Sequence, residues 1–355
     1  MKILFIPHVP NVRVVNRVYE FAKHSDNYVL HWRMQNHSLG AKIYSQCASL
    51  CVWSGAEGKT LRMPMLFRPQ AAATRWNTYM LNRLLKRYRI DAVVNANALL
   101  FDVAAIKVPV VYDLVDDHLD TNASVGLDAS RVEKIKRDIA ASRGVVCVTS
   151  ALERKAAALH ARTCTVENGV PLERFATAVS KKRELGWEHK KVFGYIGGVA
   201  PWTGLEKACE AYMRIRSDAT AMAVVGGDES AYFKRLKKRF GDAILFVGPV
   251  PPEKVADWFK TLDVGLIPFE LNDFTHHAMP IKALEYGLAG AQVLATPLRA
   301  LEAKMLPFVH TVPIEAFAEA MDRIKPETVT FDFASYSWQH RTQQLLDFVW
   351  ECLDG

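Results

Sequence analysis

Residues 264–296 read VGLIPFELNDFTHHAMPIKALEYGLAGAQVLAT, a pattern that predicts a strand, a loop, a helix and a second strand. The runs at the two ends of the stretch are short and apolar, as in the buried strands of parallel sheets. Between them, Pro280 suits the first position of a helix, and Gly290 suits the position just after its end. We therefore expect a helix over residues 280–289 whose amino end lies at the carboxyl end of a strand.

The amino end of this helix suits an anion, most naturally a phosphate, because free N–H groups and the helix dipole point at it. Met279, Ile281 and Lys282 would supply the N–H groups, since Pro280 has none. Lys282 adds a positive charge. Glu285 lies three residues further along the same face, where a carboxylate can accept two hydrogen bonds from a vicinal diol such as a ribose. The spacing alone equally allows a Lys–Glu surface pair on an ordinary helix.

The spacing Thr275-x4-Pro280-x-Lys282-x2-Glu285 resembles the donor-site signature of GT-B glycosyltransferases of the glycosyltransferase-1/family-4 type, above all a bacterial polysaccharide branch. The resemblance implies that Glu285 holds the ribose of a nucleotide-sugar and that the first helical turn holds its diphosphate. It also places Thr275 and His277 beside the donor. His277 stands where many relatives carry a further glutamate near the sugar, so the sugar and the stereochemical course are left open.

Length, composition and charge limit the classes of protein to which the chain can belong. The chain has 355 residues, 50% of them hydrophobic, which is enough for two domains of ordinary size. No apolar run approaches about 18 residues, so we expect no membrane-spanning helix, and the first apolar run predicts a strand rather than a signal peptide. The 6 scattered cysteines predict free thiols in a reducing compartment. The net charge of +7 favours anionic partners, although no nucleic-acid-binding motif is present.

The order of expected elements is strand and helix alternating in two series, with a polar, basic connection near residues 170–190. This alternation predicts an α/β protein with two parallel sheets. We place an N-terminal domain at residues 1–172 and a second domain at residues 190–330. The resemblance makes these the two Rossmann-like domains of the GT-B architecture, facing across a cleft, with a C-terminal helix over residues 336–355 that packs back on the first domain.

A glycine pair, Gly197-Gly198, follows the first strand expected in the second domain. Glycines at such a position let the backbone approach a phosphate closely. We count both glycines, and Trp202 in the turn that follows, among the donor-binding candidates. Relatives often carry a Lys-Gly pair where this chain has Thr203-Gly204, so one cation of the phosphate clamp implied by the resemblance is missing here.

Residues 113–120, DLVDDHLD, form an acidic cluster directly after an expected strand. Parallel sheets bind ligands at the carboxyl ends of their strands, and neighbouring carboxylates raise one another's pKa, as suits a proton acceptor. Aspartates are also common in turns and helix caps, which leaves a structural role open. The resemblance favours catalysis, because a similar sequence recurs in the bacterial branch. It implies that Asp116 or Asp117 acts as base or orients the acceptor, with His118 as a further candidate.

Two groups of basic residues each have two explanations. Arg13 and Arg17 lie one turn apart near the first expected helix, and they either bind a phosphate or lipid-linked acceptor or are simply solvated. Residues 74–89, TRWNTYMLNRLLKRYR, have helical spacing with aromatic side chains and several cations. Their apolar stripe is explained by packing on the sheet. Their basic, aromatic edge suits peripheral contact with an anionic membrane surface.

These observations predict a glycosyltransferase of bacterial surface polysaccharide synthesis. It would move a hexosyl or deoxyhexosyl group from a UDP-, GDP- or dTDP-linked sugar to a hydroxyl of a saccharide or lipid-linked saccharide. No Asp-x-Asp pair is placed to hold Mg²⁺ or Mn²⁺ against a diphosphate, so we expect no metal and no cofactor. We expect a cytoplasmic location, with the inner face of the plasma membrane as an alternative. A nucleotide-sugar epimerase or phosphorylase on the same fold, or a non-catalytic binding subunit, remains open.

Overall fold

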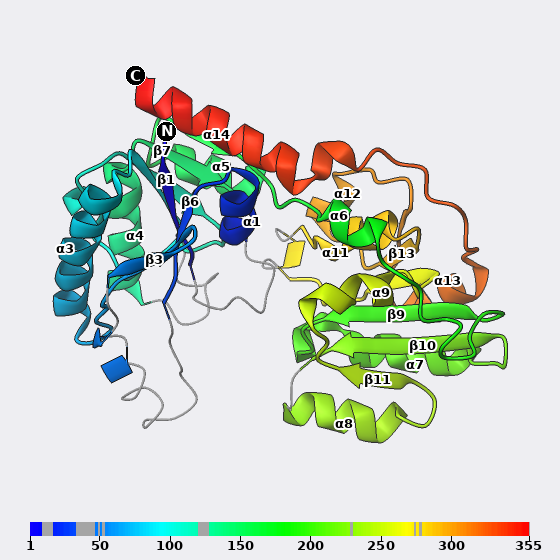
Figure 1. The fold of residues 1–355 in the computed structure, drawn as a ribbon. Helices are drawn as coiled ribbons and strands as arrows, with labels where there is room; N and C mark the ends of the chain where they lie inside the picture. Colours follow the sequence, from blue (N-terminus) through cyan, green and yellow to red (C-terminus); the bar gives the residue numbers. More distant parts are fainter. Residues whose placement is uncertain are drawn as a thin grey trace. The chain divides into compact units, whose positions relative to one another are not determined.

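The computed structural model of the chain describes residues 1–8, 17–32, 47–48, 50–51, 54–119, 128–227, 230–272, 275–276 and 279–354. These residues divide into two compact units. Unit 1 is formed by Met1–Gly169 with Trp338–Gly355, and unit 2 by Val170–Ser337. Each unit is built on a largely parallel sheet with helices packed against it, so the α/β class predicted from the alternation is confirmed (Figure 1).

The described residues of unit 1 form a sheet of 8 strands in the order β3-β4-β2-β1-β5-β6-β7-β8, with β3 antiparallel to β4 and the other pairs parallel. The strands are β1 Ile3–Ile6, β2 Tyr28–Leu30, β3 Gly55–Glu57, β4 Thr60–Arg62, β5 Ala92–Asn95, β6 Val110–Leu114, β7 Gly144–Cys147 and β8 Thr163–Thr165. The apolar residues 48–53 would suit a strand, but the described residues there are helical or in a turn.

The two faces of this sheet pack against different helices, because alternate side chains of a strand point to opposite sides. In the described part of unit 1 the helices are α1 Arg17–His24, α3 Gln70–Tyr88, α4 Ala129–Ala141, α5 Ser150–Ala157 and α14 Trp338–Asp354. Leu4 and Ile6 of β1 pack with α3 and α4, whereas Ile3 and Phe5 pack with α1 and α14.

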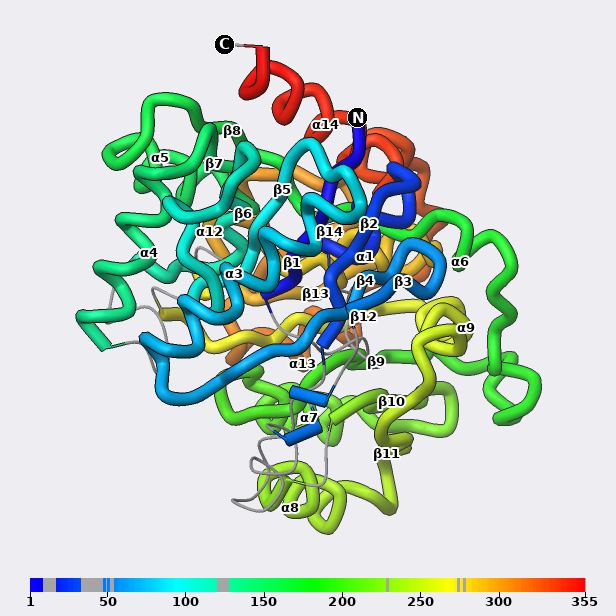
Figure 2. The backbone as a smooth tube through the Cα atoms, turned by 60° about the vertical axis from the view of Figure 1, so that its left-hand side comes forward, coloured from blue at the N-terminus to red at the C-terminus, as the bar shows by residue number. Residues whose placement is uncertain are grey.

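The last helix, α14, belongs to unit 1 although it is last in the sequence. It lies beside the amino end of β1 (Figure 1 and Figure 2). Trp338 at its start is buried and meets Phe21 of α1 edge-on, with ring centroids 5.6 Å apart. Burying these aromatic rings fixes the returning chain on unit 1.

Unit 2 contains a parallel sheet of 6 strands in the order β11-β10-β9-β12-β13-β14. The strands are β9 Lys191–Gly197, β10 Thr220–Gly226, β11 Leu245–Gly248, β12 Val264–Ile267, β13 Gln292–Ala295 and β14 Val309–Thr311. The helices that the structure describes in this unit are α6 Leu172–Ala176, α7 Leu205–Ile215, α8 Ala231–Phe240, α9 Val255–Phe259, α11 Lys282–Leu288, α12 Arg299–Glu302 and α13 Phe317–Arg323. The chain order of the strands therefore reverses between β9 and β12, and open parallel sheets bind ligands outside the carboxyl ends at such a reversal.

The helix predicted over residues 280–289 is present as α11, but its start was predicted two residues too early. The N–H of Ala283 donates to the carbonyl of Pro280 (2.9 Å), so Pro280 belongs to a turn that precedes the helix. The predicted end is confirmed, since Gly290 has φ +90°, a conformation that favours glycine.

A close contact fixes α11 on the sheet. A Cβ added to Gly265 of β12 would lie 2.2 Å from the ring of Tyr286, so only glycine admits that ring. The Tyr286 hydroxyl accepts the N–H of Ile196 on β9 (2.9 Å). The ring thereby ties α11 to both strands that flank the reversal of strand order.

Candidate functional site

Three segments that the sequence singled out meet at the reversal of strand order in unit 2. Gly197 ends β9 and Gly198 follows it, Phe269 lies after β12, and Lys282 begins α11. A Cβ added to Gly197, which has φ +140°, would lie 2.8 Å from Nζ of Lys282. The Lys282 side chain therefore reaches across to the end of β9, and glycine at position 197 leaves the room that it needs.

Aromatic rings surround the Lys282 ammonium group. Its Nζ lies 4.2 Å from the ring centroid of Tyr195 and 5.1 Å from that of Phe269. The Tyr195 hydroxyl donates to the carbonyl of Gly198 (2.6 Å), which holds the ring in place. Such rings attract a cation but give it no anionic partner. Lys282 is therefore positioned with its charge available to a ligand.

The pKa values of Lys282 and Glu285 are both displaced toward neutrality. Burial lowers the pKa of Lys282 to about 8, against the opposing effect of the nearby Glu285 carboxylate. Burial raises the pKa of Glu285 to about 7, against the opposing effects of Lys282 and Arg174. Both side chains remain half-buried rather than sealed. A surface Lys–Glu pair would not show such shifts, so this observation favours a ligand site over the alternative of an ordinary ion pair.

Trp202 lies beside this cluster. It is part of a short turn, Pro201–Thr203, and its side chain is 41% exposed. Its ring meets Phe269 edge-on, with centroids 5.0 Å apart. A Cβ added to Gly204 would lie 1.8 Å from the carbonyl oxygen of Pro268, so glycine is required for this turn to approach the end of β12. Trp202 thus borders the predicted donor position with an exposed ring face.

The N–H groups that directly follow the predicted phosphate donors are already used within the turn and the helix. Those of residues 283–285 donate to the carbonyls of Pro280 and Ile281. Pro280 is buried, and Met279 and Ile281 are half-buried. The N–H groups of Met279, Ile281 and Lys282 stay the predicted phosphate donors.

Thr275 has a structural explanation. It is fully buried, and its hydroxyl donates to the carbonyl of Glu270 (2.5 Å) while accepting the N–H of Asn272 (3.0 Å). These bonds close the loop after β12, so the prediction that Thr275 contacts the donor has no support from its placement. His277 lies outside the described residues.

A second cluster lies at the carboxyl ends of the strands in unit 1. The chain order of this sheet reverses between β1 and β5. His8 follows β1, and its carbonyl accepts the side-chain N–H of Asn97, which follows β5 (3.2 Å). The N–H of His118 donates to the carbonyl of Asp116 in the turn after β6 (2.8 Å). Unit 1 therefore brings the predicted Asp116 and His118 to one edge and adds His8.

Burial lowers the pKa of His8, and the Asp116 carboxylate opposes that effect. His118 behaves in the same way, with Asp116 and Asp117 both opposing the lowering of its pKa by burial. Within the described part of the chain, the buried Nδ1 of His8 has no hydrogen-bond partner. Both imidazoles therefore lie in the field of the Asp116 carboxylate, and their burial favours the neutral form.

Asp116 and Asp117 differ in their surroundings. Asp116 is exposed. Asp117 forms an ion pair with Lys155, and its Oδ1 accepts the N–H of Leu119 (3.3 Å). The contacts of Asp117 are those of a turn residue, so Asp116 is the better candidate of the two.

Arg17 was predicted either to bind a phosphate or lipid-linked acceptor or to be solvated, and its surroundings in the structure fit neither prediction. It is 5% exposed, and its Nε lies 3.1 Å from Oδ2 of the fully buried Asp113. It also donates to the carbonyl of Val166 (2.8 Å) and to Oδ1 of Asn168 (3.3 Å). Removing one partner of such a buried pair costs about 3–5 kcal/mol, so Arg17 is explained as a structural residue. Arg13 lies outside the described residues.

Sequence reasoning missed four residues of these clusters. Tyr195 and Phe269 sit inside apolar runs and read as core. The charge of Arg174 in α6 opposes the rise in the pKa of Glu285, and no spacing in the sequence predicts this interaction. His8 could have been found, because it directly follows the first strand, at an edge where ligands bind.

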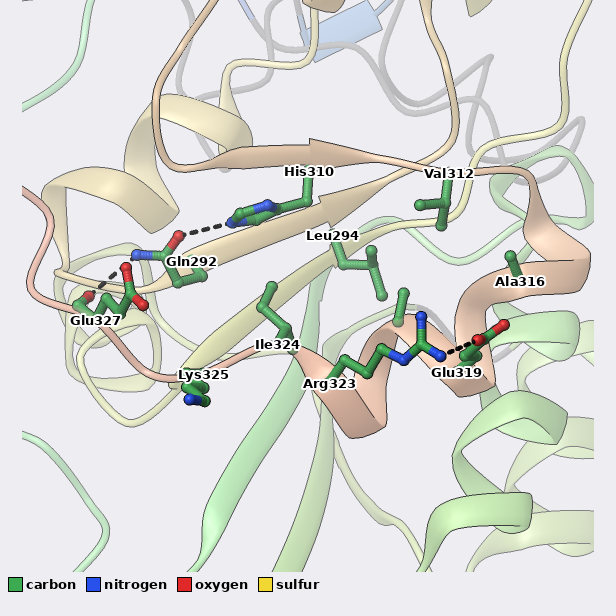
Figure 3. Close-up of a pocket in the computed structure, with 11 residues that line it drawn as sticks. Gln292, Leu294, His310, Val312, Ala316, Glu319, Arg323, Ile324, Lys325 and Glu327 are labelled. Carbon is green, nitrogen blue, oxygen red and sulfur yellow. Dashed lines mark hydrogen bonds and ion pairs between the residues drawn. The ribbon is translucent and has the colours of Figure 1, made fainter.

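A pocket of about 470 Å³ lies against β13, β14 and α13 (Figure 3). Polar side chains that line the pocket bond to one another or to the backbone. Nε2 of His310 lies 2.9 Å from Oε1 of Gln292, and Gln292 donates to the carbonyl of Glu327 (3.1 Å). Arg323 forms an ion pair with Glu319 (2.6 Å). None of the predicted site residues lines it, so it is separate from the cluster around Lys282.

The fold places the protein in a known class. Solved structures match it along the whole chain: HepE of Anabaena, in complex with UDP-glucose, has a TM-score of 0.70 and 15% identity, covering 99% of this chain and 100% of that one. Together with two Rossmann-like units, this likeness identifies the GT-B fold that the resemblance implied.

Residues 190–325, within unit 2, match the family model described as Glycosyl transferases group 1. With the GT-B fold, this match supports the glycosyltransferase class that the resemblance implied. The assignment to one bacterial branch from the signature around Glu285 stays a prediction.

Two curated relatives match part of the chain. The protein named as teichuronic acid biosynthesis glycosyltransferase TuaH of Bacillus subtilis is 27% identical over 165 residues, which cover 45% of this chain and 40% of the relative. D-inositol 3-phosphate glycosyltransferase 2 of Catenulispora acidiphila is 29% identical over 149 residues, covering 37% of this chain and 35% of the relative. The matched segments thus span less than half of either relative.

Proposed function

We propose that the chain transfers a sugar from a nucleotide-sugar, with a UDP-, GDP- or dTDP-linked hexose or deoxyhexose as donor. The acceptor would be a hydroxyl of a saccharide or lipid-linked saccharide in bacterial surface polysaccharide synthesis, on the cytoplasmic side of the membrane. The observation that carries the proposal is the Lys282–Glu285 pair at the strand-order reversal of unit 2, with both pKa values displaced. The family match, the UDP-glucose bound by HepE and the role named for TuaH support it.

In this proposal Lys282 and the N–H groups before α11 bind the diphosphate, and they stabilise the charge that develops on it as the sugar leaves. Glu285 accepts hydrogen bonds from the ribose diol. Asp116, with His8 and His118, receives the proton of the acceptor hydroxyl or orients it. Protein cations and N–H groups take the part that a metal ion plays in other transferases.

A thermal-shift screen of nucleoside diphosphates and nucleotide-sugars tests the proposal. A ligand at about 100 times its Kd adds about 2.7 kcal/mol to the free energy of unfolding, which raises Tm measurably. We expect one base to stand out, and we expect slow release of nucleoside diphosphate from the matching donor, unchanged by EDTA. No shift with any nucleotide would remove the proposal, and a shift without donor hydrolysis would favour a binding subunit.

Binding of the diphosphate should be tightest between about pH 7 and about pH 8. Below the raised pKa of Glu285 its carboxyl is protonated, and it accepts hydrogen bonds from a diol less well. Above the lowered pKa of Lys282 its amine is neutral and no longer attracts the diphosphate. Calorimetric titrations at a series of pH values measure the profile. Glu285→Gln should remove the acidic limb and move the basic limb to lower pH, because the Glu285 carboxylate holds up the pKa of Lys282. A flat profile for the unsubstituted protein would contradict the assignment.

A further inference from the structure

The outward face of α3 carries an aromatic and basic stripe. Trp76, Tyr79, Arg83 and Lys86 follow one another at spacings of three and four residues, which places them on one side of a helix. Trp76 is 40% exposed and Tyr79 is 56% exposed, with ring centroids 6.5 Å apart. The opposite side of α3 is buried in the core of unit 1 through leucines such as Leu84. The exposed rings are therefore not part of that core.

The charge of this helix has one sign. The sequence of α3, QAAATRWNTYMLNRLLKRY, contains no acidic residue. Arg75, Arg83, Lys86 and Arg87 are all exposed. Within the described part of the chain, none of these four forms an ion pair, although the Arg83 guanidinium lies 5.9 Å from the ring centroid of Tyr79. The face thus combines apolar rings with uncompensated positive charge.

Helix α8 of unit 2 is also basic, but its surface differs from the aromatic and basic face of α3. It is also rich in Lys and Arg, but Arg235 pairs with Glu206 (2.7 Å), and Arg239 pairs with Glu206 (2.8 Å) and Glu210 (2.7 Å). None of its aromatic side chains is exposed. Its chemistry is that of a solvated surface helix, which makes it a matched comparison for α3.

We infer that the outward face of α3 docks unit 1 onto the surface of an anionic lipid bilayer. Cations would meet the headgroup phosphates, and the Trp76 and Tyr79 rings would enter the boundary between headgroups and acyl chains. Any polyanion could pair with the cations. The boundary region of a bilayer also accommodates the Trp76 and Tyr79 rings, and this favours a bilayer as the partner. In the described residues, no helix has the length and apolar character needed to cross a bilayer. The contact is therefore peripheral, and it does not depend on sugar transfer.

Sedimentation of the full chain with vesicles tests this inference. Vesicles of phosphatidylcholine with phosphatidylglycerol should bind the protein, and vesicles of phosphatidylcholine alone should bind it at least about tenfold less. Added salt should release it, because screening shortens the reach of the charges. Arg75→Glu with Arg83→Glu, and separately Trp76→Ser with Tyr79→Ser, should each lower binding about tenfold or more.

The matched control is Lys237→Glu with Lys238→Glu on α8, which changes the charge by the same amount. It should leave vesicle binding close to that of the unsubstituted protein, and unchanged melting temperatures should show that all variants fold. Equal losses from the α3 and α8 variants would overturn the inference, since they would show attraction through net charge alone. Binding to RNA or to an acidic protein, but not to vesicles, through the same α3 residues would overturn it as well.

Brominated lipids locate the contact. They should quench part of the tryptophan fluorescence of the unsubstituted protein, and Trp76→Phe should lose that part while still binding vesicles. Quenching that is independent of Trp76 would place the contact elsewhere on the chain.

Discussion

Replacing Glu285 by alanine should abolish the rise in Tm that the preferred nucleoside diphosphate produces. A carboxylate that accepts two hydrogen bonds from a ribose contributes about 1.5–3 kcal/mol through each, so the affinity should fall by about 100-fold or more. The loss should be equally clear for the nucleotide-sugar, because the ribose is common to both ligands. Thermal shift across a ligand titration measures it, and isothermal calorimetry gives the Kd.

The stability of the ligand-free variant separates binding from folding. Burial raises the pKa of Glu285, which means that the fold disfavours its charged form. Alanine should therefore leave the Tm of the free protein equal or higher. Glu188→Ala is the matched control, because Glu188 is exposed and precedes the amino end of β9, opposite the end where Lys282 lies. An undiminished shift for Glu285→Ala would remove Glu285 from the site and weaken the proposed function with it.

Local sequence signals predicted the parts of unit 2 that depend on local physics. Gly290 ends its helix as expected, because a left-handed residue after a helix favours glycine. Lys282 and Glu285 were singled out by their spacing, and the structure brings Lys282 to Gly197 as the strand-order rule requires. Pro280 misled the helix start because a proline fits both the first helical turn and the turn before it.

The errors concern contacts between distant residues. Arg17 looks like a surface arginine in sequence, yet Asp113 is 96 residues away along the chain and only 3.1 Å away in space. Arg174 of α6 acts electrostatically on Glu285 of α11, and no periodicity in the sequence encodes this interaction. Spacing identifies a helix face; it does not tell whether a polar group on that face already has a partner.

Replacing Asp116 by asparagine should lower the rate of donor hydrolysis, with water as acceptor, by about 100-fold, while nucleotide binding stays intact. Asparagine keeps the size of the side chain and removes its charge, so it can neither take up a proton nor hold a neighbouring imidazolium. The Asp116 carboxylate opposes the burial effect that lowers the pKa of His8 and His118. The pKa of both imidazoles should therefore fall further in the variant, which NMR titration of the histidines measures.

Asp117→Asn is the comparison that makes this result specific. The Asp117 carboxylate acts on His118 and pairs with Lys155, but His8 lies outside its influence. The pKa of His8 should therefore stay in place in this variant, and the loss of hydrolysis should be smaller than for Asp116→Asn. A third variant, His8→Asn, should reproduce most of the Asp116 loss if the orphaned imidazole nitrogen handles the proton. If Asp116→Asn leaves both the hydrolysis rate and the His8 titration unchanged, the cluster in unit 1 is structural, and the acceptor must be activated by other residues.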